Sequence, residues 1–274
     1  MQVAQMVVVL MGAGLGAGLV AGLFGIGGGF VVVPALLVVF GYFQFPPEIL
    51  MKTAVATSLA TIIVTGFRSV YAHYKRGAVD MQIIRDWAPW LVVGAVIGTV
   101  LTRILDGAAL KIIFSVGVLL MGLHFIFPAK GNVRFKFKAE MPKGLPLAGI
   151  ATFLGGFSAL LGIGGGTPAV MVMTACGRKI HQAVATAAGF GVTIAIPGTI
   201  SNMIVGQGVE NLPPGNIGYV NMIAALSIVS MSVITAPYGA KLAHSLDGAK
   251  LKRIFGVYLV ITSAYVFYKA MVPN

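Results

Sequence analysis

The same pentapeptide, Gly-Ile-Gly-Gly-Gly, occurs twice in this sequence, at residues 25–29 and 162–166. Both copies lie inside apolar segments that are otherwise long enough to form membrane helices. Glycines propagate a helix poorly, because each one costs roughly 1 kcal/mol relative to alanine. Within a membrane, unwound backbone is stable only where protein or water satisfies its N–H and C=O groups. The repeated pentapeptide therefore predicts two helix breaks that face each other and build a site.

The apolar segments identify the class of protein. Hydrophobic residues make up 58% of the 274 residues and charged residues only 9%, whereas a soluble domain has about 25% charged residues. So few charges cannot cover a water-facing surface, and the long apolar runs lack the alternation of a transmembrane barrel. We expect an all-α polytopic membrane protein in a lipid bilayer.

Two further sequence blocks repeat in the same order as the pentapeptide. Ala-Val-Ala-Thr occurs at residues 54–57 and 183–186, and Leu-Asp-Gly-Ala at residues 105–108 and 246–249. Repeated blocks that keep one order along the chain indicate an internal duplication.

The duplication predicts the domain organisation. We expect residues 1–128 and residues 145–274 to form two repeats. Each repeat contains one glycine-broken segment plus about three transmembrane helices, and a basic linker at residues 129–144 joins them. In the second repeat, we also expect Pro197-Gly198 to interrupt the apolar segment of residues 181–205.

The distribution of Lys and Arg predicts how the repeats are oriented. If each repeat crosses the membrane an even number of times, the loops on each side hold nine Lys and Arg. If each glycine-broken segment returns to the side it came from, one side holds fourteen and the other holds four. Cytoplasmic loops carry the excess of Lys and Arg, so we expect inverted repeats with both termini periplasmic and the linker cytoplasmic. Both a re-entrant hairpin and two full crossings at each glycine segment fit this count.

Several function classes lack their sequence signatures. The net charge of +12 comes from basic residues in short loops between apolar segments, which indicates membrane topology rather than nucleic-acid binding. The single cysteine, Cys176, excludes an internal disulfide and is expected to pack as a small side chain. The four histidines are scattered and no P-loop is present. We therefore expect no enzyme activity, no cofactor and no metal.

Inverted repeats with interrupted helices are the architecture of secondary transporters, which hold substrate near the midplane between the repeats. The paired pentapeptides are each followed by a proline-bearing apolar run and an Ala-Val-Ala-Thr block. This order resembles the TauE/SafE sulfite exporter family over nearly the whole chain. The resemblance implies a permease of the bacterial inner membrane for a small sulfur-containing anion, such as sulfite or an organosulfonate such as sulfoacetate. Export is the default direction. An uptake permease, an anion channel of the same fold and a non-transporting membrane assembly protein remain alternatives.

The glycines are the first candidate substrate-binding residues. Helix N-termini expose unpaired N–H groups and a positive dipole end, which suit an anion. The candidates in the two pentapeptides are Gly27, Gly28, Gly29, Gly164, Gly165 and Gly166. Tight helix packing without a ligand is the alternative interpretation.

Polar residues around the Ala-Val-Ala-Thr blocks are further candidates. Lys52 precedes the first block and His181-Gln182 precedes the second, so a basic residue at each entrance could attract an anion. Thr57 and Thr186 are repeat-equivalent hydroxyls, and Asn202 is an amide in apolar surroundings. Arg68 is an arginine well inside an apolar segment, where ionisable residues are functional candidates. Snorkelling, helix–helix contacts and hydrogen bonds to the helix backbone are the structural alternatives.

Overall fold

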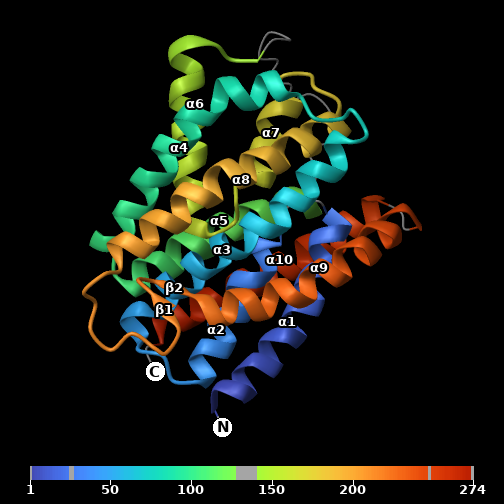
Figure 1. Ribbon diagram of the computed structural model, residues 1–274. Coiled ribbons are helices and arrows are strands. Elements are labelled where there is room, and N and C mark those ends of the chain that lie inside the picture. The colour runs from blue at the N-terminus through green and yellow to red at the C-terminus, as the bar shows by residue number, and fades with distance from the viewer. Residues whose placement is uncertain (1, 25–27, 128–140, 246–247, 273–274) are drawn as a thin grey trace.

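The computed structural model describes residues 2–24, 28–127, 141–245 and 248–272 (Figure 1). Within these residues the chain forms ten helices and one short hairpin. The predicted first repeat holds α1 (Gln2–Phe24), α2 (Gly29–Tyr42), α3 (Pro47–Tyr74), α4 (Met81–Ile104) and α5 (Gly107–Ile126). The second holds α6 (Gly144–Leu161), α7 (Gly166–Ala175), α8 (Ile180–Val205), the strands β1 (Asn216–Ile217) and β2 (Val220–Asn221), α9 (Met222–Ser245) and α10 (Gly248–Met271).

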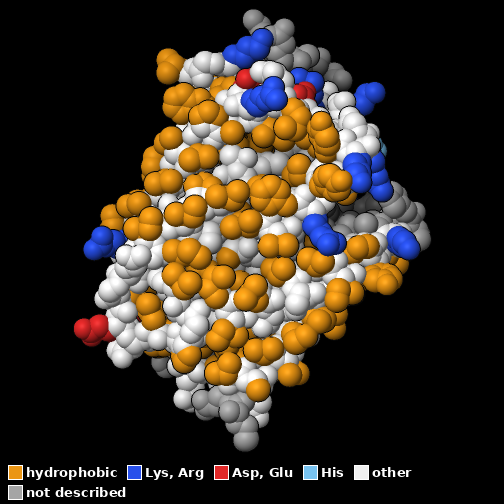
Figure 2. Space-filling model, in the orientation of Figure 1, with side chains coloured by type: hydrophobic (Ala, Val, Ile, Leu, Met, Phe, Trp, Pro, Cys, Tyr) orange, Lys and Arg blue, Asp and Glu red, His pale blue; other side chains and the backbone are white. Residues whose placement is uncertain are grey.

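Eight of the described helices are long and apolar enough to cross a membrane, all except α2 and α7. The predicted class, an all-α polytopic membrane protein, is therefore confirmed. Hydrophobic side chains form a broad band across the face in Figure 2, and Lys and Arg gather mostly along its upper end and right-hand edge. An apolar band with charges at its margin is the surface that a bilayer requires.

Local sequence signals explain several helix boundaries. The carboxylate of Asp80 accepts a hydrogen bond from the backbone N–H of Ile83 over 3.2 Å and caps α4. The carboxylate of Asp106 accepts one from Ala109 over 2.6 Å and caps α5. These acidic side chains also lie at the positive ends of the helix dipoles.

The predicted interruption at Pro197-Gly198 is wrong. Helix α8 is continuous from Ile180 to Val205, with Pro197 inside it. A proline removes one intrahelical hydrogen bond, and in a membrane bundle the neighbouring helices stabilise the remainder. Gly198 has a packing role, because a Cβ built there would lie 3.0 Å from the side chain of Leu59 on α3.

Helices α3 and α8 form the centre of the bundle. Buried residues make up 67% and 72% of their apolar windows, against 28–39% for the other six candidate spans. The two helices lie against each other and run in opposite directions (Figure 1). The Ala-Val-Ala-Thr block of each repeat lies near the start of one of these two helices. Both blocks are therefore in the buried centre of the bundle.

The peripheral helices pack in reciprocal pairs. Helix α1 packs against α9, and α6, the repeat equivalent of α1, packs against α4. In each pair, a glycine at the equivalent position of its repeat permits the close contact. A Cβ built on Gly18 would lie 2.5 Å from the carbonyl oxygen of Ser232, and one built on Gly155 would collide with the carbonyl of Leu91. Small residues at such positions let membrane helices approach closely.

Candidate functional site

The two glycine segments break the chain at equivalent points. Helix α2 begins after Gly28 and α7 begins after Gly165, and both glycines have left-handed backbone with φ of 78° and 73°. At about 1.5 Å per residue, the helices that follow are about 21 and 15 Å long, which is less than the roughly 30 Å hydrocarbon core. These lengths favour a re-entrant segment over two full crossings. Gly27, a predicted site residue, lies outside the described residues.

The two glycine segments meet inside the bundle. A Cβ built on Gly29 would lie 2.5 Å from the carbonyl oxygen of Gly162 and 2.8 Å from the Cα of Ile163. Only a glycine permits this approach of the two backbones. The hydroxyl of Ser58 on α3 donates a hydrogen bond to the same carbonyl of Gly162 over 2.7 Å. The expected face-to-face arrangement of the glycine segments is confirmed for Gly29 and Gly162.

The second glycine segment is buried along its whole length, from Gly162 to Gly166. A Cβ built on Gly164 would lie 2.9 Å from the side chain of Ile62, and one built on Gly165 would lie 2.5 Å from Ile194. Apolar side chains of α3 and α8 therefore close around the loop. Any transported molecule that reaches this loop must be admitted by a movement of the helices.

Two hydroxyls beside this loop have no partner in the described part of the chain. Ser158 lies one turn before the break, on α6, and is fully buried. Thr167 lies in the first turn of α7 and is 4% exposed. Neither hydroxyl oxygen has a hydrogen-bond partner among the described residues. A buried polar group without a partner costs about 1–3 kcal/mol, so both positions suit a ligand that accepts hydrogen bonds.

The candidates Thr57 and Thr186 make equivalent contacts across the repeats. The hydroxyl oxygen of Thr57 on α3 accepts a hydrogen bond from the backbone N–H of Asn221 over 3.0 Å. The hydroxyl oxygen of Thr186 on α8 accepts one from the backbone N–H of Asp80 over 3.0 Å. Asn221 immediately precedes α9 and its side chain accepts from Ala224 over 2.8 Å, as Asp80 does for α4. Each threonine therefore anchors a helix start of the other repeat.

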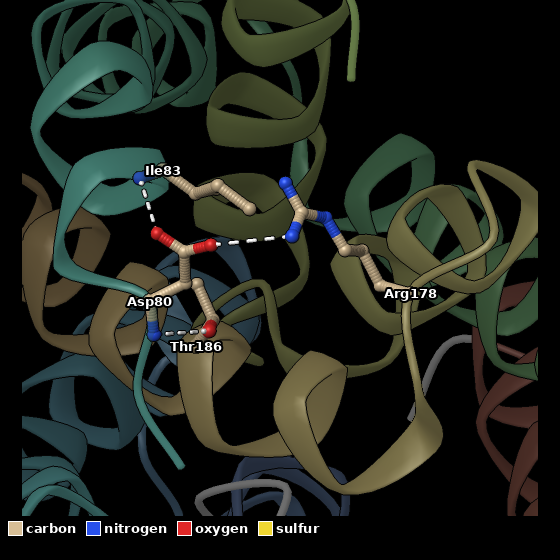
Figure 3. Close-up of polar contacts among 4 residues, drawn as sticks. All are labelled: Asp80, Ile83, Arg178 and Thr186. Atoms are coloured by element: carbon tan, nitrogen blue, oxygen red, sulfur yellow. Dashed lines mark hydrogen bonds and ion pairs between the residues drawn. The ribbon is translucent and has the colours of Figure 1, made fainter. Parts of the chain in front are cut away.

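One of these two anchors carries an ion pair as well. Figure 3 shows Asp80 between Ile83, Thr186 and Arg178, with the carboxylate turned toward the guanidinium. The distance between Asp80 Oδ2 and the Arg178 nitrogen is 3.5 Å, and the two side chains are 32% and 42% exposed. At the other anchor the neutral amide of Asn221 bonds Asn216 and the carbonyl of Pro214 instead.

The basic candidates lie away from the glycine segments. The ammonium of Lys52 at the start of α3 lies 5.7 Å from the ring centre of Tyr219. His181 and Gln182 are exposed at the start of α8. Arg68 is exposed toward the end of α3. Lys52 is thus half-buried, whereas Arg68 and His181 are exposed, and no described ion pair involves these three residues.

Asn202 is buried near the end of α8. Its amide nitrogen donates to the carbonyl of Gly198 over 2.8 Å, while its amide oxygen has no described partner. Its backbone carbonyl accepts from the backbone N–H of Tyr219 over 3.2 Å. Asn202 therefore holds the β hairpin and does not reach the glycine segments through any described contact.

An open pocket of about 500 Å³ lies elsewhere, at the starts of α4 and α6. Its lining includes Asp86, Trp90 and Lys143 and no residue of either glycine segment. Among the described residues, no group of three or more His, Cys, Asp or Glu side chains could hold a metal ion. The pKa of the Cys176 thiol is raised, because burial raises it more than the nearby charge of Arg178 lowers it.

Sequence reasoning did not select Ser58, Ser158 or Thr167 as site residues. Ser58 directly follows a repeated block, and Thr167 directly follows the second pentapeptide, so adjacency to the repeats was the available signal. Ser158 has no such signal, because a serine in an apolar helix usually bonds its own backbone. Its position beside Gly165 follows only from the fold of the loop.

The chain is similar to proteins described as membrane transporters. The family described as Sulfite exporter TauE/SafE matches residues 10–266. A probable membrane transporter protein of Haemophilus influenzae is 33% identical and the match covers 92% of this chain and 95% of the relative. The probable membrane transporter protein YunE of Bacillus subtilis is 26% identical over 96% and 98% of the two chains. MJ0441 of Methanocaldococcus jannaschii, which has the same description, is 28% identical over 91% of each. No solved structure matches this chain.

Proposed function

This chain belongs to the TauE/SafE sulfite exporter family and is a multi-pass membrane transporter, and we propose that it moves a small sulfur-containing anion across the bacterial inner membrane. The substrate is sulfite or an organosulfonate such as sulfoacetate, and transport is export from the cytoplasm. The mechanism is that of a secondary transporter or passive permease.

The contact between Gly29 and Gly162 is the observation that carries this proposal. It brings together two broken segments from opposite repeats beside α3, the helix that packs centrally with α8. Discontinuous helices of this kind present their N-terminal ends to anionic substrates near the bilayer midplane. The N-terminal ends of α2 and α7 supply unpaired backbone N–H groups to an anion without a buried cation.

We propose inverted repeats for residues 1–128 and 145–274, with the basic 129–144 linker in the cytoplasm and both termini in the periplasm. Helix α1 begins and α10 ends at the lower end of the molecule in Figure 1, whereas α6 begins at the upper end. Lys and Arg gather mostly at the upper end and the right-hand edge (Figure 2). The positive-inside rule assigns this basic margin to the cytoplasm.

The candidate residues have separate roles in this scheme. The backbone N–H groups of Gly28, Gly29 and Gly164–Gly166 face the substrate. Lys52 at the start of α3 and His181 with Gln182 at the start of α8 attract anions to opposite entrances, since α3 and α8 run in opposite directions. For Thr57, Thr186, Asn202 and Arg68, substrate contact at the glycine segments requires a conformation other than the one in Figure 1.

Flux measurements in proteoliposomes test the proposal. Purified protein is reconstituted and loaded with labelled sulfite, sulfate, thiosulfate, sulfoacetate or taurine, and efflux is followed under imposed pH and voltage gradients. We expect saturable movement of at least one sulfur-containing anion. Flux without saturation or counter-transport would indicate a channel. Movement of none of the five anions would contradict the proposal and favour an assembly protein.

A further inference from the structure

The loop at residues 162–166 offers hydrogen-bond donors to a ligand at its α7 end. The carbonyl of Gly162, at its other end, already accepts a hydrogen bond from Ser58. The N–H groups in the first turn of α7 lack intrahelical acceptors, as in every helix, and they carry the positive end of the helix dipole. Pro168, in the same turn of α7, has no backbone N–H group and so cannot donate to a ligand.

Ser158 points at the residue that caps α7. A Cβ built on Gly165 would lie 3.5 Å from the hydroxyl oxygen of Ser158. This hydroxyl is fully buried and has no partner among the described residues. The hydroxyl of Thr167, a residue in the first turn of the helix that is 4% exposed, has no described partner either. Two buried hydroxyls with no described partner therefore lie at one helix N-terminus.

The first repeat lacks both hydroxyls. The equivalent of Gly165 is Gly28, where a Cβ would lie 3.2 Å from the methyl group of Ala21. Ala21 therefore occupies the position of Ser158, and buried Phe30 occupies that of Thr167. The two half-sites share a backbone and differ in their donors.

We propose that the substrate's oxyanion group binds at the N-terminus of α7, held by the hydroxyls of Ser158 and Thr167 and by the backbone N–H groups of Gly164–Gly166. The first repeat contributes only backbone groups, at Gly28 and Gly29. This inference rests on the proposed function and assigns the binding group of that same site to one repeat.

The donors also define the class of anion. No described Lys or Arg side chain contacts the loop, so neutral groups and a helix dipole must offset the buried charge. Such a site suits an oxyanion group that carries one negative charge, as in hydrogensulfite or a sulfonate. A dianion such as sulfate has a much larger desolvation cost, which uncharged donors offset poorly. The side chains of Ile62 and Ile194 provide an apolar wall beside the loop.

Saturable ligand-induced stabilisation of the full chain in detergent tests this assignment. The probes are hydrogensulfite, methanesulfonate and sulfate at matched ionic strength, and the variants are Ser158→Ala and Thr167→Val. We expect each variant to weaken binding of the two monoanions about tenfold, the effect of losing one hydrogen bond to a charged group. Thr167→Ser retains the hydroxyl and should retain binding. Sulfate should bind at least tenfold more weakly than methanesulfonate to the wild-type protein.

Thr174→Val is the matched control. The Thr174 hydroxyl lies on the same helix and bonds the carbonyl of Val170 over 2.7 Å, so its loss should leave binding within twofold. Without ligand, Ser158→Ala should not lower the unfolding temperature, because the Ser158 hydroxyl bonds no group in the described part of the protein. If the Ser158 hydroxyl instead stabilised the fold, Ser158→Ala would lower the unfolding temperature in the absence of ligand. A Ser158→Ala/Thr167→Val variant that binds like the wild type, which itself binds and transports, would overturn this inference alone. A wild type that neither binds nor transports would overturn the proposed function too.

Discussion

Thr186 on α8 accepts a hydrogen bond from the backbone N–H of Asp80, the residue that caps α4, over a distance of 3.0 Å. Thr57 and Asn221 repeat this relationship between α3 and α9. The most buried helix of each repeat is therefore fastened to a helix start of the other repeat. Any movement that separates α8 from α4, or α3 from α9, must break one of these bonds.

Replacing Thr186 or Thr57 by valine should destabilise the protein by about 1 kcal/mol each, the net value of one hydrogen bond. The backbone N–H of Asp80 or Asn221 would lose its acceptor. Thermal unfolding in detergent measures the effect, and Thr→Ser at the same positions is the control, because serine retains the hydroxyl. Wild-type stability in both valine variants would show that these bonds contribute nothing.

The two functions of the Asp80 side chain can be separated. Asp80→Asn removes the ion pair with Arg178 but keeps an oxygen that caps α4, as Asn221 does for α9. Because the pair is partly exposed, its loss should cost no more than about 0.5 kcal/mol and depend on salt. Asp80→Ala also removes the cap and should cost about 1 kcal/mol more. Equal stabilities of the two variants would contradict a capping role.

Gly165→Ala should impair both folding and transport. Its φ of 73° costs a residue with a Cβ about 1–2 kcal/mol, and the added methyl group would crowd Ile194. Gly149→Ala is the control, since Gly149 is an exposed helical residue with nothing within 4 Å of an added Cβ. Flux and unfolding temperature are measured for both. Normal transport by the Gly165→Ala variant would show that the loop is not part of the substrate site.

Reporter fusions test the proposed topology. A reporter at the C-terminus should be periplasmic, and one inserted within residues 129–144 should be cytoplasmic, because the linker holds five Lys and Arg. Enzymatic reporters active on only one side of the membrane make the measurement. Both reporters on one side would refute the inverted arrangement.

Cys176 should react slowly with maleimides in the folded protein. Burial raises the pKa of its thiol, so the reactive thiolate forms only at a higher pH than usual, and the side chain is 2% exposed. The labelling rate should rise with pH and become fast after denaturation. Rapid labelling at neutral pH would contradict the packing role predicted for this residue.

The sequence was most informative where a pattern repeats locally. The paired pentapeptides predicted two breaks in contact, and Gly29 and Gly162 are in contact. Repeat equivalence also singled out Thr57 and Thr186. Their partners could not be predicted, because Asn221 and Asp80 lie 164 and 106 residues away along the chain.

Single residues were harder to interpret than repeats. Pro197 was expected to interrupt a helix that is continuous, because the surrounding bundle outweighs the loss of one backbone bond. Ser158 looked like any serine in an apolar helix, and only the backbone path of the next loop brings it beside Gly165. Long-range packing therefore determined the side chains that the sequence left unassigned.

The ion pair between Asp80 and Arg178 occurs at one anchor, and its counterpart at the other anchor is an uncharged asparagine. An ion pair within the protein adds no free energy over a complete transport cycle. It therefore cannot set the direction of net substrate movement, which follows the substrate and ion gradients. It can change only the relative stability of conformations in which Asp80 and Arg178 are in contact and conformations in which they are apart. Since salt weakens exposed ion pairs, ionic strength should shift the balance between such conformations while leaving the final equilibrium of the substrate unchanged.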